Sequence, residues 1–397
     1  MITQIRIKNF KAIKDSDELK LNPISCFIGY NGSGKSSVLE ALLTLREMTM
    51  ENLDKALDRW KGFENIQFKG TKRKRVIQMN AFAYNGVQIF DQPIAFKIKS
   101  VHKRKGRFNN YSAESFLTKY AEFDKILILK EVFELSSSKD YKSFIRDFQG
   151  QVYFTTSKKP NKILEKRFKI AMNKSLFSDQ SLQHDINQWQ FLRLNPDVMG
   201  EPYPEKRTAG YLGLNMDGSN VAEYLLSIKD VSLEAYEGIL DTMISSILPY
   251  AIDLQSELTS AIDRKVYLSL TEKDYKVPGW LLSSGTLRIL AILSVLRHPE
   301  PAPVVIIEEL ENGLDPRTIH VVINEIRRFV KQTGSQVIFT THSPYLLDLM
   351  KLEEIVFVEK IDGEVKFSKP GDNDELKIWA EKFSPGKLYT MSRFNTV

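Results

Sequence analysis

The chain has 397 residues, of which 42% are hydrophobic and 27% are charged, and its formal net charge is +6. This composition is that of a globular protein long enough for two lobes or for one large domain with an insertion. No apolar run reaches the roughly 18 residues that a transmembrane helix needs. The N-terminus lacks the apolar core of a signal peptide, and the single cysteine, Cys26, cannot form an internal disulfide. We therefore expect a cytoplasmic protein with no membrane partner.

Most of the chain outside its middle alternates between strand and helix patterns. In residues 1–100, the stretches ITQIRIKNF, ISCFIG, RVIQMNAFAY and PIAFKIK are predicted as strands, and KSSVLEALLTLREM as a helix. Strand and helix patterns alternate again over residues 191–397. These two segments predict the two lobes of one α/β domain.

The middle segment, residues 101–190, differs in both pattern and charge. The helical spacing of Phe116, Tyr120, Phe123 and Leu127 predicts a helix within SAESFLTKYAEFDKILILKEVFEL, and NKILEKRFKIAMNKSLF predicts another. The segment contains 17 lysines and arginines against 10 acidic residues, a net charge of +7, while the rest of the chain carries −1. We therefore expect a basic helical insertion between the lobes.

The first chemical motif is FIGYNGSGKSS, which follows an apolar strand and opens a helix. This is the context of a phosphate-binding P-loop, or Walker A motif, whose backbone N–H groups and helix dipole attract phosphate. We expect Lys35 to contact the β- and γ-phosphates and Ser36 to bind Mg²⁺. The alternative is a glycine-rich turn without a ligand. The residues expected to bind the nucleotide are Asn31, Gly32, Ser33, Gly34, Lys35, Ser36 and Ser37.

A pair of carboxylates follows the apolar run VVII near the other end of the chain. A buried strand that ends in Glu308 and Glu309 delivers both to the sheet edge that also carries the P-loop. In P-loop enzymes the first acid of such a pair holds Mg²⁺, and a second acid can polarise the attacking water. We assign Glu308 to the metal and Glu309 to the water; solvated acids after a strand are the alternative.

Three more features complete the pattern. Asp315 and Pro316 predict the start of a helix with an apolar stripe, and the strand QVIFTTHSP ends at His342. A lone histidine is often structural, but at this strand end His342 could reach a γ-phosphate. Further back, LLSSGT places small residues directly before an apolar helix, whose N-terminus would suit an anion.

In order and spacing, the P-loop, LLSSGT, IIEELENGLDP and TTHSP resemble the motifs of the ABC-type ATPase heads of the SMC, RecF and OLD-like group. The opening IRIKNFKAI and the segment MDGSNVAEYLLSI are also similar to that group, which includes AAA-type ATPases of anti-phage defence systems that lack a Toprim nuclease domain. The resemblance covers both ends of the chain but not residues 101–190. It implies an ABC-type P-loop NTPase head that uses ATP and Mg²⁺.

The resemblance also implies a site shared between subunits. Ser283 matches the signature serine, and Gly285 matches the glycine whose amide meets the γ-phosphate bound by a neighbouring copy. His342 matches the switch histidine, and Asp315 lies in the loop that crosses the dimer interface. We therefore expect a homodimer or a larger even-numbered homo-oligomer.

The sequence departs from the group's pattern in three places. Glu308 stands where most ABC ATPases have aspartate, and the Gln-loop residue is unclear, with Gln67 as one candidate and a plain surface glutamine as the alternative. Too little chain follows His342 for a Toprim domain, so any nuclease or toxin is expected as a separately encoded effector protein.

The resulting hypothesis is a slow ATPase whose ATP-dependent dimerisation gates a partner in anti-phage defence or DNA repair. The basic segment predicts DNA, RNA or an acidic DNA-mimic protein as a partner, with a solvated basic surface as the alternative. One rival is a weakly hydrolysing ATP-bound scaffold that sequesters a toxin or nuclease. Another, the ATPase subunit of a transporter, is disfavoured because about 250 residues separate Lys35 from Ser283.

Overall fold

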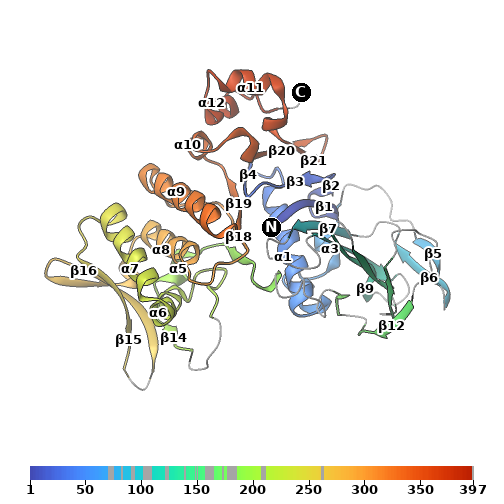
Figure 1. Cartoon of the computed structure of the whole chain (residues 1–397), viewed down its shortest axis with the longest axis horizontal. Coiled ribbons are helices and arrows are strands. Elements are labelled where there is room, and N and C mark those ends of the chain that lie inside the picture. The colour runs from blue at the N-terminus through green and yellow to red at the C-terminus, as the bar shows by residue number, and fades with distance from the viewer. Residues whose placement is uncertain are drawn as a thin grey trace.

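The computed structural model consists of three sheets with helices between and around them (Figure 1). The described residues are 1–69, 76–81, 84–90, 94–101, 110–120, 125–137, 140–147, 149, 151–156, 165–171, 174–176, 186–206, 212–260 and 263–395. In this part of the chain, none of the helices combines the length and the apolarity that crossing a membrane requires.

A six-stranded sheet joins the two ends of the sequence. Its order is β13-β18-β19-β4-β20-β21, and all neighbouring pairs are parallel except β20 and β21. Parallel strands of this kind are buried on both faces and therefore appear in the sequence as continuous apolar runs such as VVII. The strands are β4 (Ile24–Ile28), β13 (Gln190–Leu192), β18 (Val304–Ile307), β19 (Gln336–Thr341), β20 (Ile355–Ile361) and β21 (Glu364–Ser368).

The two faces of this sheet pack against different helices. Because side chains alternate along a strand, Val304 and Ile306 of β18 lie in one hydrophobic core with α1 (Lys35–Met50). Val305 and Ile307 lie in the other core, with α8 (Ser284–Leu296) and α9 (Pro316–Thr333). The sheet therefore separates α1 from α8 and α9, as Figure 1 also shows.

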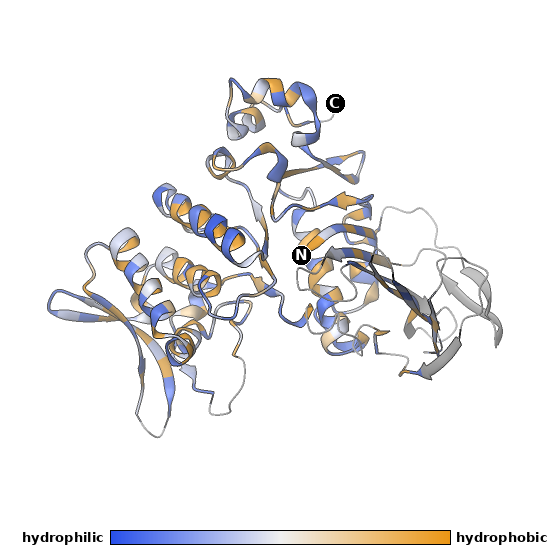
Figure 2. Ribbon diagram, in the orientation of Figure 1, coloured by the Kyte–Doolittle hydropathy of each residue, from blue (hydrophilic) through white to orange (hydrophobic). Residues whose placement is uncertain are grey.

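The helix α9 has the predicted apolar stripe, which is confirmed by the burial of Ile319, Val322, Ile323, Ile326 and Phe329. Figure 2 shows the resulting bands of hydrophobic and hydrophilic residues along the helix. Asp315 caps it, and Pro316 is its first residue.

An antiparallel sheet covers the other side of α1, because Ile5, Ile7 and Phe10 of β1 share a core with that helix. Its order is β12-β11-β10-β9-β8-β7-β1-β2, with β3, β5 and β6 paired alongside. The strands are β1 (Ile2–Phe10), β2 (Ile13–Asp15), β3 (Leu19–Lys20), β5 (Val76–Ala81), β6 (Tyr84–Phe90), β7 (Ile94–Val101), β8 (Asn110–Tyr120), β9 (Lys125–Ser136), β10 (Tyr141–Asp147), β11 (Gln151–Thr155) and β12 (Glu165–Lys169). Short helices α2 (Leu53–Asp58) and α3 (Phe63–Ile66) follow α1.

The expected helical insertion is wrong for the described part of residues 101–190. The stretch predicted as one long helix forms the antiparallel pair β8 and β9, and part of the second predicted helix forms β12. Tyr111, Ala113, Ser115 and Leu117 are buried in alternation along β8, which is the period of a strand. Small or polar residues at two of these positions hid that period in the sequence.

The third sheet, with helices packed on it, forms a separate lobe around the signature segment (Figure 1). Its strands are β14 (Tyr203–Pro204), β15 (Asp253–Leu258), β16 (Lys265–Glu272) and β17 (Tyr275–Pro278). Its helices are α5 (Pro196–Met199), α6 (Val221–Val231), α7 (Leu233–Thr242), the π-helical turn Met243–Ile247 and the 3₁₀ turn Gly279–Leu281. The chain ends with α10 (Pro344–Asp348), the 3₁₀ turns Leu352–Glu354 and Pro370–Asp372, α11 (Asp374–Ala380) and α12 (Pro385–Thr390).

Candidate nucleotide site

The P-loop connects β4 to α1 and is held closely by neighbouring strands. A side chain at Gly29 would place its Cβ 1.9 Å from the carbonyl oxygen of Val358 in β20. Gly34 has a φ of 104°, a left-handed conformation that favours glycine, and α1 begins at the next residue. The strand–loop–helix context expected for this motif is therefore confirmed.

Lys35 lies inside this loop with only 5% of its surface exposed. Its Nζ donates hydrogen bonds to the carbonyl oxygens of Gly29 and Tyr30, both at 2.8 Å. Burial lowers the pKa of Lys35 to about 8, and the nearby Glu309 and Glu311 carboxylates oppose that shift. The amine is thus a buried cation that a phosphate would stabilise.

Other groups of the loop fit a phosphate ligand. The Ser33 hydroxyl oxygen is buried and has no hydrogen-bond partner among the described residues. Ser36 is in the first turn of α1, where unpaired N–H groups and the helix dipole favour an anion. The exposed Asn31 and Gly32 leave the loop open on its outer side, while Ser37 is buried. An orphaned donor and a buried amine are what a nucleotide's phosphates would satisfy.

Glu308 directly follows β18, on the side of the sheet that faces α1, because Ile306 two residues earlier faces that helix. Its backbone N–H donates to Leu192 O at 2.9 Å. Its side chain is 16% exposed and forms an ion pair with Arg193, whose Nε lies 3.2 Å from Glu308 Oε2. The structure therefore places the expected metal carboxylate on the same side as the P-loop helix.

Glu309 and His342, which are 33 residues apart in the sequence, lie together. Glu309 has a φ of 50°, and its N–H donates to Thr340 Oγ1 at 2.8 Å. His342 Nε2 is 3.8 Å from Glu309 Oε1. Both Glu309 and His342 are thus positioned by the neighbouring strands β18 and β19.

Glu311 is a site residue that the motifs of the sequence did not single out. Its Oε1 accepts a hydrogen bond from the backbone N–H of His342 at 2.5 Å. Its Oε2 is buried without a hydrogen-bond partner in the described part of the chain, and its charge acts on Lys35. The signal was present in the sequence, because EELE puts a third acid four residues after the strand end.

The signature residues lie at the N-terminus of α8. Ser283 is exposed and caps the helix, with its Oγ accepting from Thr286 N at 3.1 Å. A Cβ at Gly285 would lie 2.5 Å from Gly313 O, so this helix end packs against the loop that follows Glu311. The α8 helix and the P-loop helix lie on opposite faces of the six-stranded sheet.

Two further positions lie beside this arrangement. Burial lowers the pKa of Arg288 in α8, and the charge of Glu309 opposes that shift. Gln67 pairs with Phe10 beside the antiparallel sheet.

These features define an ABC-type P-loop NTPase head. Residues 24–348 match the family described as "AAA domain, putative AbiEii toxin, Type IV TA system", and the chain belongs to this family of P-loop ATPases. No curated protein matches the chain in sequence.

Solved structures share the fold. An SMC head bound to the C-winged helix domain of ScpA is 14% identical, with a TM-score of 0.55, covering 92% of this chain and 97% of that one. An Smc head domain with an extended coiled coil, bound to the C-terminal domain of ScpA derived from Pyrococcus furiosus, is 16% identical, with a TM-score of 0.52 over 96% and 98% of the two chains. At these identities the likeness establishes the SMC-head fold alone.

Proposed function

We propose that the chain is an Mg²⁺-dependent ATPase that binds ATP between two copies of itself. The supporting observation is that the P-loop helix α1 and the signature helix α8 pack on opposite faces of one sheet. The signature therefore faces away from its own P-loop helix. A second copy supplies the missing half, with the exposed N-terminus of α8 directed at the γ-phosphate.

Each site residue then has a role set by its position. Lys35 and the P-loop N–H groups hold the phosphates, and Ser36 and Glu308 hold the metal, which supplies positive charge to the transferring phosphoryl group. Glu309 orients and polarises the attacking water. Because His342 lies beside Glu309 and its backbone is held by Glu311, it senses the same γ-phosphate from the neighbouring strand.

A mixing experiment tests the shared site. Lys35→Ala disables the P-loop and Ser283→Arg disables the signature, so neither protein alone should hydrolyse ATP. Mixed dimers contain one intact pair of half-sites and should recover part of the wild-type turnover, measured as phosphate release. Ser245→Arg, at an exposed serine of the same lobe, is the matched control and should keep full turnover. If well-mixed heterodimers stay inactive while each protein still binds its partner, independent shared sites are ruled out.

We further propose that the ATPase acts in anti-phage defence, gating a separately encoded effector or a nucleic acid. The family description names a toxin of a toxin–antitoxin system, and the similar SMC heads were solved with a domain of another protein. DNA repair is the neighbouring possibility that the same fold allows. Purification with the products of adjacent reading frames tests this role; association with a membrane protein instead would favour a transporter.

One observation favours the weakly hydrolysing scaffold as a second candidate. The carboxylate assigned to the metal is already paired with Arg193, which would slow the loading of the site. Turnover separates the two proposals, because a scaffold would hold ATP for hours without releasing phosphate.

A further inference from the structure

Arg193 lies beside Glu308 because of how two parallel strands are paired. In the register of β13 and β18, Phe191 is opposite Ile306 and Leu192 is opposite Ile307. Phe191 and Ile306 both belong to the core on the α1 side. Since side chains alternate along a strand, the residues two positions further on, Arg193 and Glu308, project toward that same side at the same sheet edge.

The two partners differ in how firmly they are held. Both backbones are fixed, because Arg193 N donates to Met216 O at 2.7 Å and Glu308 N donates to Leu192 O at 2.9 Å. The Glu308 side chain is only 16% exposed, whereas that of Arg193 is 64% exposed. The carboxylate is therefore the more fixed member of the pair, and the guanidinium is the one that can move into solvent.

We propose that the Arg193 guanidinium pairs with the Glu308 carboxylate in the nucleotide-free protein. This pairing prevents a divalent cation from binding to the carboxylate until a nucleotide arrives. This inference rests on the proposed Mg²⁺-dependent ATPase function. A guanidinium and a divalent cation compete for the same oxygens, and the repulsion between a unit and a double charge is twice that between two unit charges. Because arginine keeps its positive charge, only a movement of the side chain releases the carboxylate.

A bound nucleotide favours the metal over the guanidinium as the partner of Glu308. Its phosphates add negative ligands for the metal and also offer the displaced guanidinium a partner that its planar fork suits. Metal and nucleotide binding are thereby coupled through one side chain.

The experiment measures Mn²⁺ binding to the full-length protein by electron paramagnetic resonance, without nucleotide. Wild type should bind Mn²⁺ weakly, and Arg193→Gln should bind it more tightly, on the order of tenfold. With a non-hydrolysable ATP analogue present, the affinities of the two proteins for Mn²⁺ should converge, because the guanidinium has then left the carboxylate in wild type. Adding Glu308→Gln to Arg193→Gln should abolish the gain.

Arg59→Gln is the matched control. Arg59 lines the same cavity as Arg193 and Glu308, but it pairs with Glu47 at 2.8 Å, so its loss removes a nearby charge without freeing Glu308. Equal Mn²⁺ affinity of wild type and Arg193→Gln, or an equal gain in Arg59→Gln, overturns the inference. A gain that survives Glu308→Gln also overturns it. If wild type binds no Mn²⁺ even with the ATP analogue, the proposed ATPase function itself is wrong, which is a different result.

Discussion

At the scale of single residues, Lys35 connects burial to a pH dependence. Its pKa is lowered to about 8 by burial, so above that pH the free protein holds the amine increasingly neutral. ATP favours the charged amine, and the nucleotide's own phosphates have finished titrating well below pH 8. ATP binding should therefore take up a proton and weaken as pH rises from 8 to 10, by up to tenfold per pH unit.

Nucleotide titrations at pH 7.5 and pH 9.5 check this expectation. Lys35→Arg is the control, because a guanidinium stays charged over this range and its weaker binding should vary little with pH. An affinity of wild type that is constant between the two pH values would contradict the assigned shift.

Glu309 carries the second prediction at this scale. Replacing it with glutamine keeps the shape and the donors around it, so ATP binding should persist, while turnover should fall by about 10²- to 10⁴-fold with the loss of the base. Phosphate release and nucleotide binding are measured on the same preparation. Glu237→Gln, at an exposed position of α7, should change neither, and normal turnover by Glu309→Gln would assign the water to another residue.

The site was predictable from the sequence only where its residues belong to a motif. Glu309 and His342 were expected from their strand ends, and they lie together. Arg193 belongs to no motif. Its place beside Glu308 depends on the pairing of β13 with β18, and nothing in the local sequence of either strand specifies that pairing.

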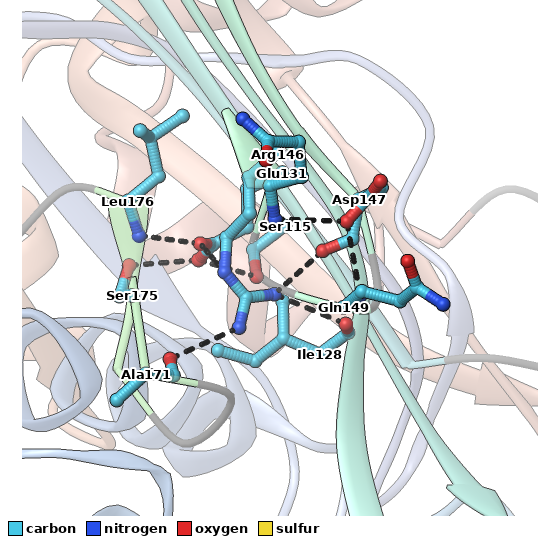
Figure 3. A network of polar contacts seen from close by, with 10 residues as sticks. Ser115, Ile128, Glu131, Arg146, Asp147, Gln149, Ala171, Ser175 and Leu176 are labelled. Carbon is cyan, nitrogen blue, oxygen red and sulfur yellow. Dashed lines mark hydrogen bonds and ion pairs between the residues drawn. The ribbon is translucent and has the colours of Figure 1, made fainter. Parts of the chain in front are cut away.

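At the scale of elements, a buried ionic network links neighbouring strands of the antiparallel sheet (Figure 3). Glu131 of β9 and Arg146 of β10 are both fully buried, with Arg146 Nε 3.8 Å from Glu131 Oε2. Glu131 also accepts hydrogen bonds from Ser175 Oγ at 2.7 Å and Leu176 N at 2.5 Å. The pair therefore attaches the segment around residue 175 to the strands.

Breaking one side of this pair should be costly. Burial raises the pKa of Glu131, and Arg146 opposes that shift. Arg146→Met should lower the free energy of unfolding by about 3 to 5 kcal/mol, because it leaves an uncompensated buried carboxylate. Without Arg146 the pKa of Glu131 rises further, so its carboxyl group becomes neutral in acid. The loss of unfolding free energy caused by Arg146→Met should therefore shrink as pH falls toward 5 and grow toward neutral pH.

Thermal and denaturant unfolding of wild type and Arg146→Met at pH 5 and pH 7.5 measure the loss of unfolding free energy and its pH dependence. Lys142→Met on the same strand, a half-exposed position, should cost far less. A deficit of Arg146→Met no larger than that of Lys142→Met would show that the pair is not stabilising.

The same region shows why the element prediction failed. Phe116 and Tyr120 have helical spacing in the sequence, yet β8 pairs with β9 from Asn110 opposite Ser136 to Tyr120 opposite Lys125. A strand's stability comes from its partner strand, and local spacing contains no information about that partner. The parallel strands were easier to predict, because burial on both faces leaves long apolar runs.

At the scale of the whole molecule, the two cores on opposite faces of the six-stranded sheet keep the P-loop helix α1 apart from the signature helix α8. The resemblance to ABC-type heads implied a site shared between copies, and the separation of α1 from α8 on which the proposal rests follows from the alternation of β18 between the two cores. The concentration of positive charge in one segment is also a property of the whole molecule. Residues 101–190 carry a net charge of +7, and their described strands extend the same antiparallel sheet that packs on α1.

The last prediction concerns that excess, which should face a polyanion: DNA, RNA or an acidic protein that imitates one. The cluster to test lies outside the described residues and consists of Lys103, Arg104, Lys105 and Arg107. Changing all four to glutamine should weaken polyanion binding and lower its salt dependence by roughly one unit of slope per lost phosphate contact, yet spare ATP turnover.

Titrations with a polyanion at several salt concentrations, in the presence of ATP, measure the affinity and its salt dependence. The charge-matched control is a variant in which four exposed lysines become glutamine, namely Lys331, Lys351, Lys377 and Lys382. If wild type binds no polyanion, the segment is a solvated surface; if both variants bind like wild type, the contact lies elsewhere, with residues 69–75 the next cluster to change.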